Sequence, residues 1–120
     1  MDRTEKIKEI VIHYGTKAQR LKAIEELTEL AEVLIKDINK REYHRADILE
    51  EVADVQIMLL QLKEIYLFTD EELEKMIDSK MRRTMRRVKD EINLDNYISD
   101  FNHGNKSDST ADRATMGDDR

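Results

Sequence analysis

One segment of the chain decides the predicted fold: RADILEEVADVQIMLLQLKEIY, residues 45–66. Its apolar residues recur at steps of three and four, the spacing that places side chains on one face of an α-helix. The main stripe consists of Ile48, Val52, Val55, Leu59 and Leu62, and the stripe is widened by Leu49, Ile57, Met58 and Leu60. A helix that is apolar on most sides belongs inside a bundle or at an oligomer interface. We therefore expect a largely buried helix over residues 45–66.

A second amphipathic segment precedes this one, over residues 16–39. Its apolar stripe, which we expect to face the core, consists of Leu21, Ile24, Leu27, Leu30, Ala31, Leu34 and Ile38. Thr16 and Gln19 have the spacing of a capping box at the start of this helix. The polar linker over residues 39–44 is short, so we expect the two helices to be antiparallel neighbours.

Two further helices are predicted on either side of this pair. The first runs over residues 4–14, with Ile7, Ile10, Val11 and Tyr14 on its apolar face, and Gly15 ends it. A capping box at Thr69 and Glu72 opens the last helix, which is expected to end near Ile92. Its inward residues would be Leu73, Ile77, Met81, Met85, Val88 and Ile92. The sequence thus predicts an all-α four-helix bundle that oligomerises, over residues 1–101, followed by a disordered polar tail over residues 102–120.

The composition narrows the class of function. The chain has 27 acidic and 21 basic residues and a net charge of −6, so general nucleic-acid binding is unlikely to be its role. With no cysteine it has neither a disulfide framework nor a zinc-thiolate site. No signal peptide and no apolar run of membrane-spanning length is evident. We expect a soluble, cytoplasmic protein without membrane association.

Two pairs of acidic residues carry the predicted chemistry. Glu26 and Glu29 lie three positions apart, as do Glu51 and Asp54, so each pair shares a helix face. If the two helices are neighbours, four carboxylates converge and repel one another unless a cation lies between them. Oxygen ligands suit a hard divalent ion, so we expect a Mg²⁺ site, with Mn²⁺ as a substitute.

The same residues resemble a known family. Glu-Glu-x-x-Glu at residues 25–29, followed after 21 residues by Glu51-x-x-Asp54, is similar to the MazG-like all-α nucleoside triphosphate pyrophosphohydrolases. Tyr14-Gly15, Gln19 before residues 23–27, Ala53-Asp54-Val55 and Lys80-x-x-Arg83 are similar to the small bacterial and phage-type members. The resemblance covers roughly residues 7–88. It implies a MazG-like bundle that hydrolyses a (d)NTP to a (d)NMP and pyrophosphate with Mg²⁺.

The resemblance also suggests roles for individual residues. Glu26, Glu29, Glu51 and Asp54 would hold one or two ions, with Glu25 as the base that orients the attacking water and Glu50 in an outer position. Lys80 and Arg83 would bind the β and γ phosphates. Gln19 and Arg87 would make further substrate contacts, although Gln19 also fits the capping box. The expected partners are a nucleoside triphosphate and further copies of this chain, in a dimer or a tetramer.

The same residues also have three alternative interpretations. The acids would be purely structural if they paired with Lys22 and other basic neighbours. A di-iron bundle would need Glu-x-x-His pairs, but Ile10 precedes His13 and Arg41 precedes His44. The third alternative is a non-enzymatic helical interaction protein, binding nucleic acid through the basic residues 80–89. Part of that basic run has a structural explanation, because cations in the second half of a helix complement its dipole.

Overall fold

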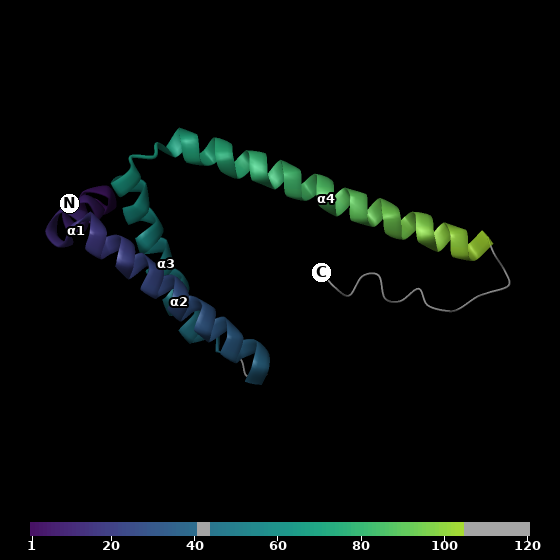
Figure 1. Ribbon diagram of the computed structural model, residues 1–120, viewed down its shortest axis with the longest axis horizontal. Helices are drawn as coiled ribbons and strands as arrows, with labels where there is room; N and C mark the ends of the chain where they lie inside the picture. The colour runs from purple at the N-terminus through teal and green to yellow at the C-terminus, as the bar shows by residue number, and fades with distance from the viewer. Residues whose placement is uncertain (41–43, 105–120) are drawn as a thin grey trace. The chain divides into compact units, whose positions relative to one another are not determined.

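The structure of the chain is a computed structural model that describes residues 1–40 and 44–104. Within these residues the protein has four helices and no strand: α1 (Arg3–Tyr14), α2 (Thr16–Lys40), α3 (Arg45–Tyr66) and α4 (Asp70–Gly104), shown in Figure 1. The all-α prediction is confirmed. The predicted bounds of the first three helices agree with the structure to within one residue, whereas α4 extends well beyond Ile92.

The start and the end of α1 have local causes. Asp2 caps the helix: its side chain accepts a hydrogen bond from the Glu5 backbone nitrogen at 2.8 Å, and Glu5 accepts one from the Asp2 nitrogen at 3.2 Å. At the other end Gly15 adopts φ 92°, a conformation that residues with a Cβ rarely adopt. Gly15 donates its N–H to the carbonyl of Val11 at 2.8 Å, so α1 ends at Tyr14, as predicted.

The capping box predicted at Thr16 and Gln19 is wrong. Thr16 is the first residue of α2 rather than its cap, and the carbonyl of Gly15 accepts the hydrogen bond of the Gln19 backbone nitrogen at 3.1 Å. The Gln19 side chain is directed to α3 instead. The first hydrogen bond of α2 is therefore accepted by the backbone of Gly15.

Helices α1, α2 and α3 pack on one another within one compact unit, Met1–Asp70, and the contact between α2 and α3 is the most extensive. The buried apolar residues of this unit are Ile7 and Val11 of α1, Ala23 of α2, and Val55 and Met58 of α3. Ala23 is small, so the backbones of α2 and α3 can approach closely beside it. This contact positions the acidic residues of the two helices.

The face of α2 that packs on α3 differs from the prediction. The side chains described as buried or half-buried are Gln19, Ala23, Glu26, Glu29, Leu30, Val33 and Asp37, which lie along one side of the helix. Apart from Leu30, the predicted inward stripe is exposed; Ile24, for example, is 61% exposed and Ile38 73% exposed. The apolar stripe of α2 is wide, and the neighbouring helices of this unit leave one side of it exposed. We call Leu21, Ile24, Leu27, Leu34, Ile35 and Ile38 the outer face of α2.

The packing of α3 also differs in part. Val55 is buried as predicted, together with Met58 and Gln61, whereas Leu59 of the predicted main stripe is exposed. Leu49 and Ile57 are exposed as well. Val55, Met58 and Gln61 are three residues apart, which is less than the 3.6 residues of one helical turn. The line of buried residues therefore winds around α3 and does not follow the predicted apolar stripe.

From Glu71 onward, α4 belongs to a second unit. None of its side chains is buried, and the six residues predicted to face inward are exposed, so that prediction is wrong for the part of the chain described. Because α4 is the only described helix of its unit, none of the described residues of that unit covers its apolar stripe. The predicted tail boundary at residue 102 falls inside α4, where Leu94, Tyr97 and Phe101 continue the helical spacing; residues 105–120 lie outside the described residues.

Candidate metal site

The acidic residues of α2 and α3 converge in two overlapping groups. Glu25, Glu26 and Glu29 of α2 form the outer group, and Glu26 of α2 with Glu51 and Asp54 of α3 form the inner group. Within each group the three side chains offer oxygen atoms that all lie within 4.8 Å of one another. The four acids predicted to converge on one point are thus divided: Glu29 belongs to the outer group, Glu51 and Asp54 belong to the inner group, and Glu26 is common to both. The two groups together are called the acidic cluster.

Glu26 has an unusual environment for a carboxylate. The residue is only 7% exposed because it lies on the face of α2 that packs on α3. Its Oε2 is buried without a hydrogen-bond partner among the described residues, and so is Oε2 of Glu51. Burying a charged oxygen without a partner is costly, and a cation in the inner group would remove this cost. The donor set consists of carboxylate oxygens alone, which fits Mg²⁺.

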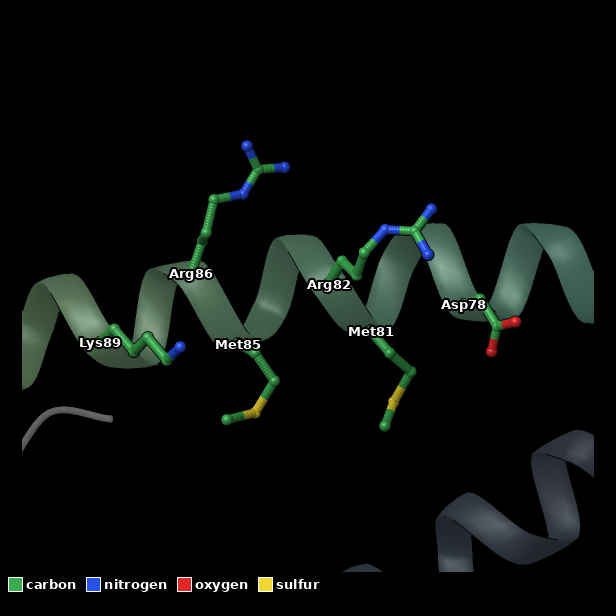
Figure 2. A pocket seen from close by; sticks show the side chains of 6 residues that line it. All are labelled: Asp78, Met81, Arg82, Met85, Arg86 and Lys89. Carbon is green, nitrogen blue, oxygen red and sulfur yellow. The ribbon is translucent and has the colours of Figure 1, made fainter.

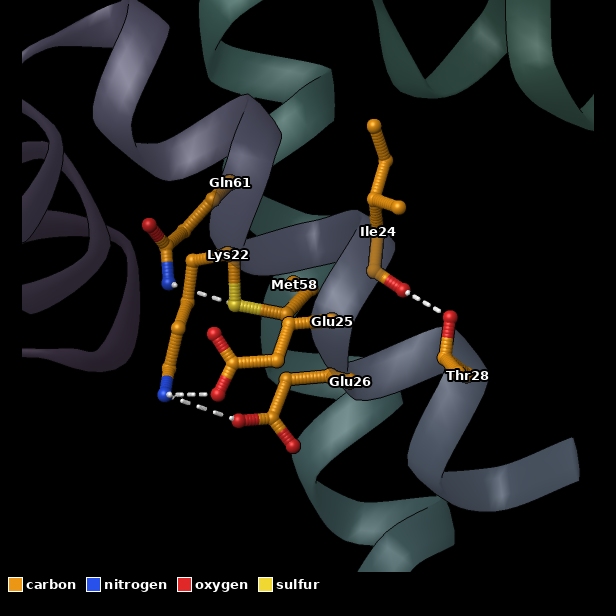
Figure 3. A network of polar contacts seen from close by, with 7 residues as sticks. All are labelled: Lys22, Ile24, Glu25, Glu26, Thr28, Met58 and Gln61. Carbon is orange, nitrogen blue, oxygen red and sulfur yellow. Dashed lines mark hydrogen bonds and ion pairs between the residues drawn. The ribbon is translucent and has the colours of Figure 1, made fainter. Parts of the chain in front are cut away.

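Lys22 is the basic residue that contacts the cluster. Lys22 lies on α2 about one turn before the acids. Its Nζ lies 3.5 Å from Oε1 of Glu25 and 3.2 Å from Oε1 of Glu26 (Figure 3). The hydrogen bond to Glu26, followed by the charge of Glu25, raises the pKa of Lys22 above its usual value. Pairing with Lys22, the structural alternative weighed above, therefore exists for the Oε1 atoms, but it leaves Oε2 of Glu26 unpartnered.

Two carboxyl groups of the cluster have raised pKa values. The pKa of Glu29 is raised because its protonated form donates a hydrogen bond to Glu26, because its charged form meets the charge of Glu26, and because of partial burial. Burial raises the pKa of Glu51 first, and the charges of Asp54 and Glu26 add to the effect. In both cases the charges of neighbouring carboxylates add to the main cause of the shift, which is a hydrogen bond for Glu29 and burial for Glu51.

A buried amide pair lies beside the cluster on the same face of α2. Gln19 is 7% exposed and donates from Nε2 to Oε1 of Gln61 at 2.7 Å; Gln61, 2% exposed, in turn contacts Sδ of Met58 through Nε2 at 3.6 Å. The sequence reasoning missed Gln61. The signal available was a lone amide within the apolar run over residues 57–62, where a buried polar residue needs a partner.

The other predicted site residues have the following places. Glu25 is exposed at the edge of the outer group, whereas Glu50 is exposed and belongs to neither group. Lys80, Arg83 and Arg87 are exposed on α4, where their spacing puts them on one face.

One hollow lies along α4 and away from the acidic cluster. It measures about 610 Å³ and is lined by α4 alone, through Asp78, Met81, Arg82, Met85, Arg86 and Lys89. Figure 2 shows Met81 and Met85 projecting from one side of the helix and Arg82 and Arg86 from another. A hollow with a single helix as its wall encloses no ligand, so we assign no site to it.

No protein-family model, no curated protein sequence and no solved structure matches this chain. Within the described residues, no helix combines the length and the apolar character needed to cross a membrane. The chemical feature from which a function can be inferred is thus the carboxylate cluster, with its two buried and unpartnered oxygens.

Proposed function

We propose that this protein is a Mg²⁺-dependent nucleoside triphosphate pyrophosphohydrolase of the MazG-like type, converting a (d)NTP and water to a (d)NMP and pyrophosphate. One observation carries the proposal: the buried Glu26, with its unpartnered Oε2, is shared by two groups of carboxylates from neighbouring helices. A buried acidic cluster destabilises a fold unless it binds a cation, and a divalent cation held by carboxylates is the usual means of binding a polyphosphate.

The carboxylates would divide the work between the two groups. Glu26, Glu51 and Asp54 would hold an ion in the inner group, and Glu29 would contribute from the outer group. A bound Mg²⁺ would neutralise the phosphate charge that develops as the linkage between the α and β phosphates breaks. The protein's own part is to keep these oxygens in place, and the α2–α3 contact serves that purpose.

Glu25 is the proposed base. Its side chain is 57% exposed, so a water molecule can reach it, and its carboxylate lies next to the ligands in the outer group. It would accept a proton from the attacking water. Replacing Glu25 with Gln should lower kcat by about 10²-fold or more while leaving the stabilisation by Mg²⁺ intact, because the inner group is unchanged.

Lys80 and Arg83 are proposed to bind the β and γ phosphates, Arg83 through a planar fork and Lys80 as a point charge, with Arg87 as an additional contact. Support comes from their common face on α4 and from the six basic residues without an acidic one over residues 80–89. For Gln19, the hydrogen bond to Gln61 supports a scaffold role more than the reading of a base.

A homo-oligomer is part of the proposal. The outer face of α2 exposes six large aliphatic side chains, and contiguous apolar patches of this kind are rare on monomers. A second copy of the chain is the simplest cover. The outer face lies on the same helix as the acids, so assembly would also hold α2 in place around the metal site.

The test is a panel of nucleoside triphosphates, incubated with Mg²⁺ or Mn²⁺ and the full chain, with pyrophosphate and orthophosphate measured separately. We expect pyrophosphate release that Glu26→Gln abolishes and Glu32→Gln preserves, because Glu32 lies on α2 outside both groups. Orthophosphate as the first product would contradict the proposed cleavage position.

The alternative function is that of an interaction protein that binds nucleic acid through residues 80–89. The observation in its favour is that all six basic side chains of this segment are exposed. It would predict salt-dependent binding of DNA or RNA and no pyrophosphate release from any nucleotide. It leaves the unpartnered oxygens of Glu26 and Glu51 without an explanation.

A further inference from the structure

The acidic cluster already contains one cation, the ammonium group of Lys22. We infer that Lys22 is a built-in counter-ion that takes the place of a second divalent cation, so that the first ion binds the inner group and a second must displace Lys22 from the outer group. This inference rests on the proposed metal site and says how many ions the resting protein holds. Activity alone would not reveal it.

The contacts of Lys22 distinguish the two groups. Its Nζ lies within ion-pair distance of Glu25 and Glu26, two of the three members of the outer group. Among the described residues, no basic side chain forms an ion pair with Glu51 or Asp54. The outer group is therefore partly neutralised, whereas the inner group depends on a ligand from outside.

The two carboxylate oxygens of Glu26 show the same difference between a neutralised and an unneutralised side. Oε1 contacts Lys22 at 3.2 Å, whereas Oε2, like Oε2 of Glu51 in the inner group, is buried and has no hydrogen-bond partner in the part of the chain that the structure describes. An ion entering the inner group finds free oxygens, so nothing has to be displaced. An ion entering the outer group meets the positive charge of Lys22 and must first break both of its ion pairs.

The ion pairs of Lys22 depend on the spacing of residues within α2. Lys22 precedes Glu25 by three residues and Glu26 by four, so α2 alone brings the three side chains together. The side chain is 47% exposed, and its long stem allows the ammonium group to move into solvent when an ion replaces it. Lys22 therefore hinders cation binding to the outer group only weakly. This fits an outer group that binds its cation after the inner group has done so.

The experiment is a Mn²⁺ titration of the full chain at neutral pH without nucleotide, with free Mn²⁺ followed by electron paramagnetic resonance. We expect one tight ion in the wild type and a second, weaker one. Lys22→Gln should tighten the second binding event roughly tenfold, on the scale of one or two partly exposed ion pairs. Lys22→Arg, which keeps the charge, should behave like the wild type.

Lys36→Gln is the matched control. It removes the same charge from the same helix, but Lys36 lies 14 residues further on, about 21 Å along α2. That distance exceeds the screening length of about 8 Å at physiological ionic strength, so the second event should not change. Circular dichroism of each variant should show the helix content of the wild type.

Three results would overturn the inference. They are two ions of equal affinity in the wild type, a second event that Lys22→Gln leaves unchanged or weakens, and an equal effect of Lys36→Gln. With pyrophosphate release still present, any of these would remove the role of Lys22 and leave the proposed function standing. Ordered Mn²⁺ binding without hydrolysis of any nucleotide would support the role of Lys22 and contradict the proposed function. A wild-type chain that binds no Mn²⁺ would overturn both the role of Lys22 and the proposed function.

Discussion

On α2, the side that packs on α3 contains Gln19, Glu26 and Asp37 among its residues, whereas the outer face consists of six large aliphatic side chains left exposed. In most soluble helices the apolar side is buried and the polar side meets solvent. Helix α2 departs from this rule, because polar residues lie beside Ala23, Leu30 and Val33 on its packing side while six large aliphatic side chains are exposed. Under the proposed function, the acids on the packing side would hold a cation, and the exposed apolar face would contact a second copy of the chain.

The packing side and the outer face of α2 also differ in the kind of contact that would stabilise them. Among the described residues, no basic side chain pairs with the α3 acids Glu51 and Asp54, and a small cation would supply the missing positive charge. The outer face lacks only an apolar surface, which a second copy of the chain can supply. A variant of the acids on the packing side should therefore change metal binding and leave assembly intact. A variant on the outer face should change assembly and leave metal binding intact. The predictions below use this separation.

The largest effect is expected for Glu26→Gln on the buried side. Because Glu26 is common to both groups, its loss should reduce pyrophosphate release by about 10²–10³-fold or more and abolish the rise in melting temperature on adding Mg²⁺. In the absence of metal the variant should melt above the wild type, because a neutral amide replaces a buried anion. Thermal unfolding with and without Mg²⁺ measures both effects. An undiminished Mg²⁺ response would refute the site.

On the outer face, Ile35→Lys should separate the proposed oligomer. A charge in the middle of an apolar interface should raise the dissociation constant by about 100-fold or more, the scale of an interface hot spot. Sedimentation at several concentrations measures the change. Ile12→Lys is the control, because Ile12 is an exposed residue of α1 outside the outer face. A wild-type chain that sediments as a monomer at every concentration would contradict the proposed assembly.

A smaller effect is expected at the buried amide pair. Gln61→Leu removes the acceptor of Gln19 and leaves that amide buried without a partner, so the free energy of unfolding should fall by about 1–3 kcal/mol. The double variant Gln19→Leu with Gln61→Leu should recover part of the loss, because neither polar group then remains. Urea denaturation measures the four members of the cycle. Gln56→Leu, at an exposed position of α3, should change little.

The smallest effect concerns pH. The pKa values of Glu29 and Glu51 are raised in the folded protein, so the folded state binds these protons more tightly than the unfolded state. Their contribution therefore favours folding below the usual carboxyl pKa and turns unfavourable as pH rises through the raised values. In EDTA, the melting temperature of the wild type relative to the variant with Glu29→Gln and Glu51→Gln should fall from about pH 4 to pH 7. Saturating Mg²⁺ should reverse this trend, and a difference that does not depend on pH would contradict it.

Much of the site follows from the sequence because it depends on short spacings. Glu26 and Glu29, like Glu51 and Asp54, share a helix face at three residues apart, and the structure brings all four into one cluster. Gly15 marks the break between α1 and α2 for an equally local reason. The sequence reasoning failed where two faces of one helix competed for burial: it assigned Leu21 and Ile24 to the core and did not foresee the partner of Gln19.

By itself, the sequence determined the helical fold class, the bounds of α1 to α3 and the carboxylate pairs, because each depends on interactions within about one helical turn. Only the tertiary structure decided that Glu26 is shared by the inner and outer groups, that its Oε2 is buried without a partner, and that the apolar outer face of α2 is exposed. Helical periodicity fixes the angles between side chains around one axis. Which side of the helix meets its neighbour depends on the sum of contacts between helices, and no single segment contains that information.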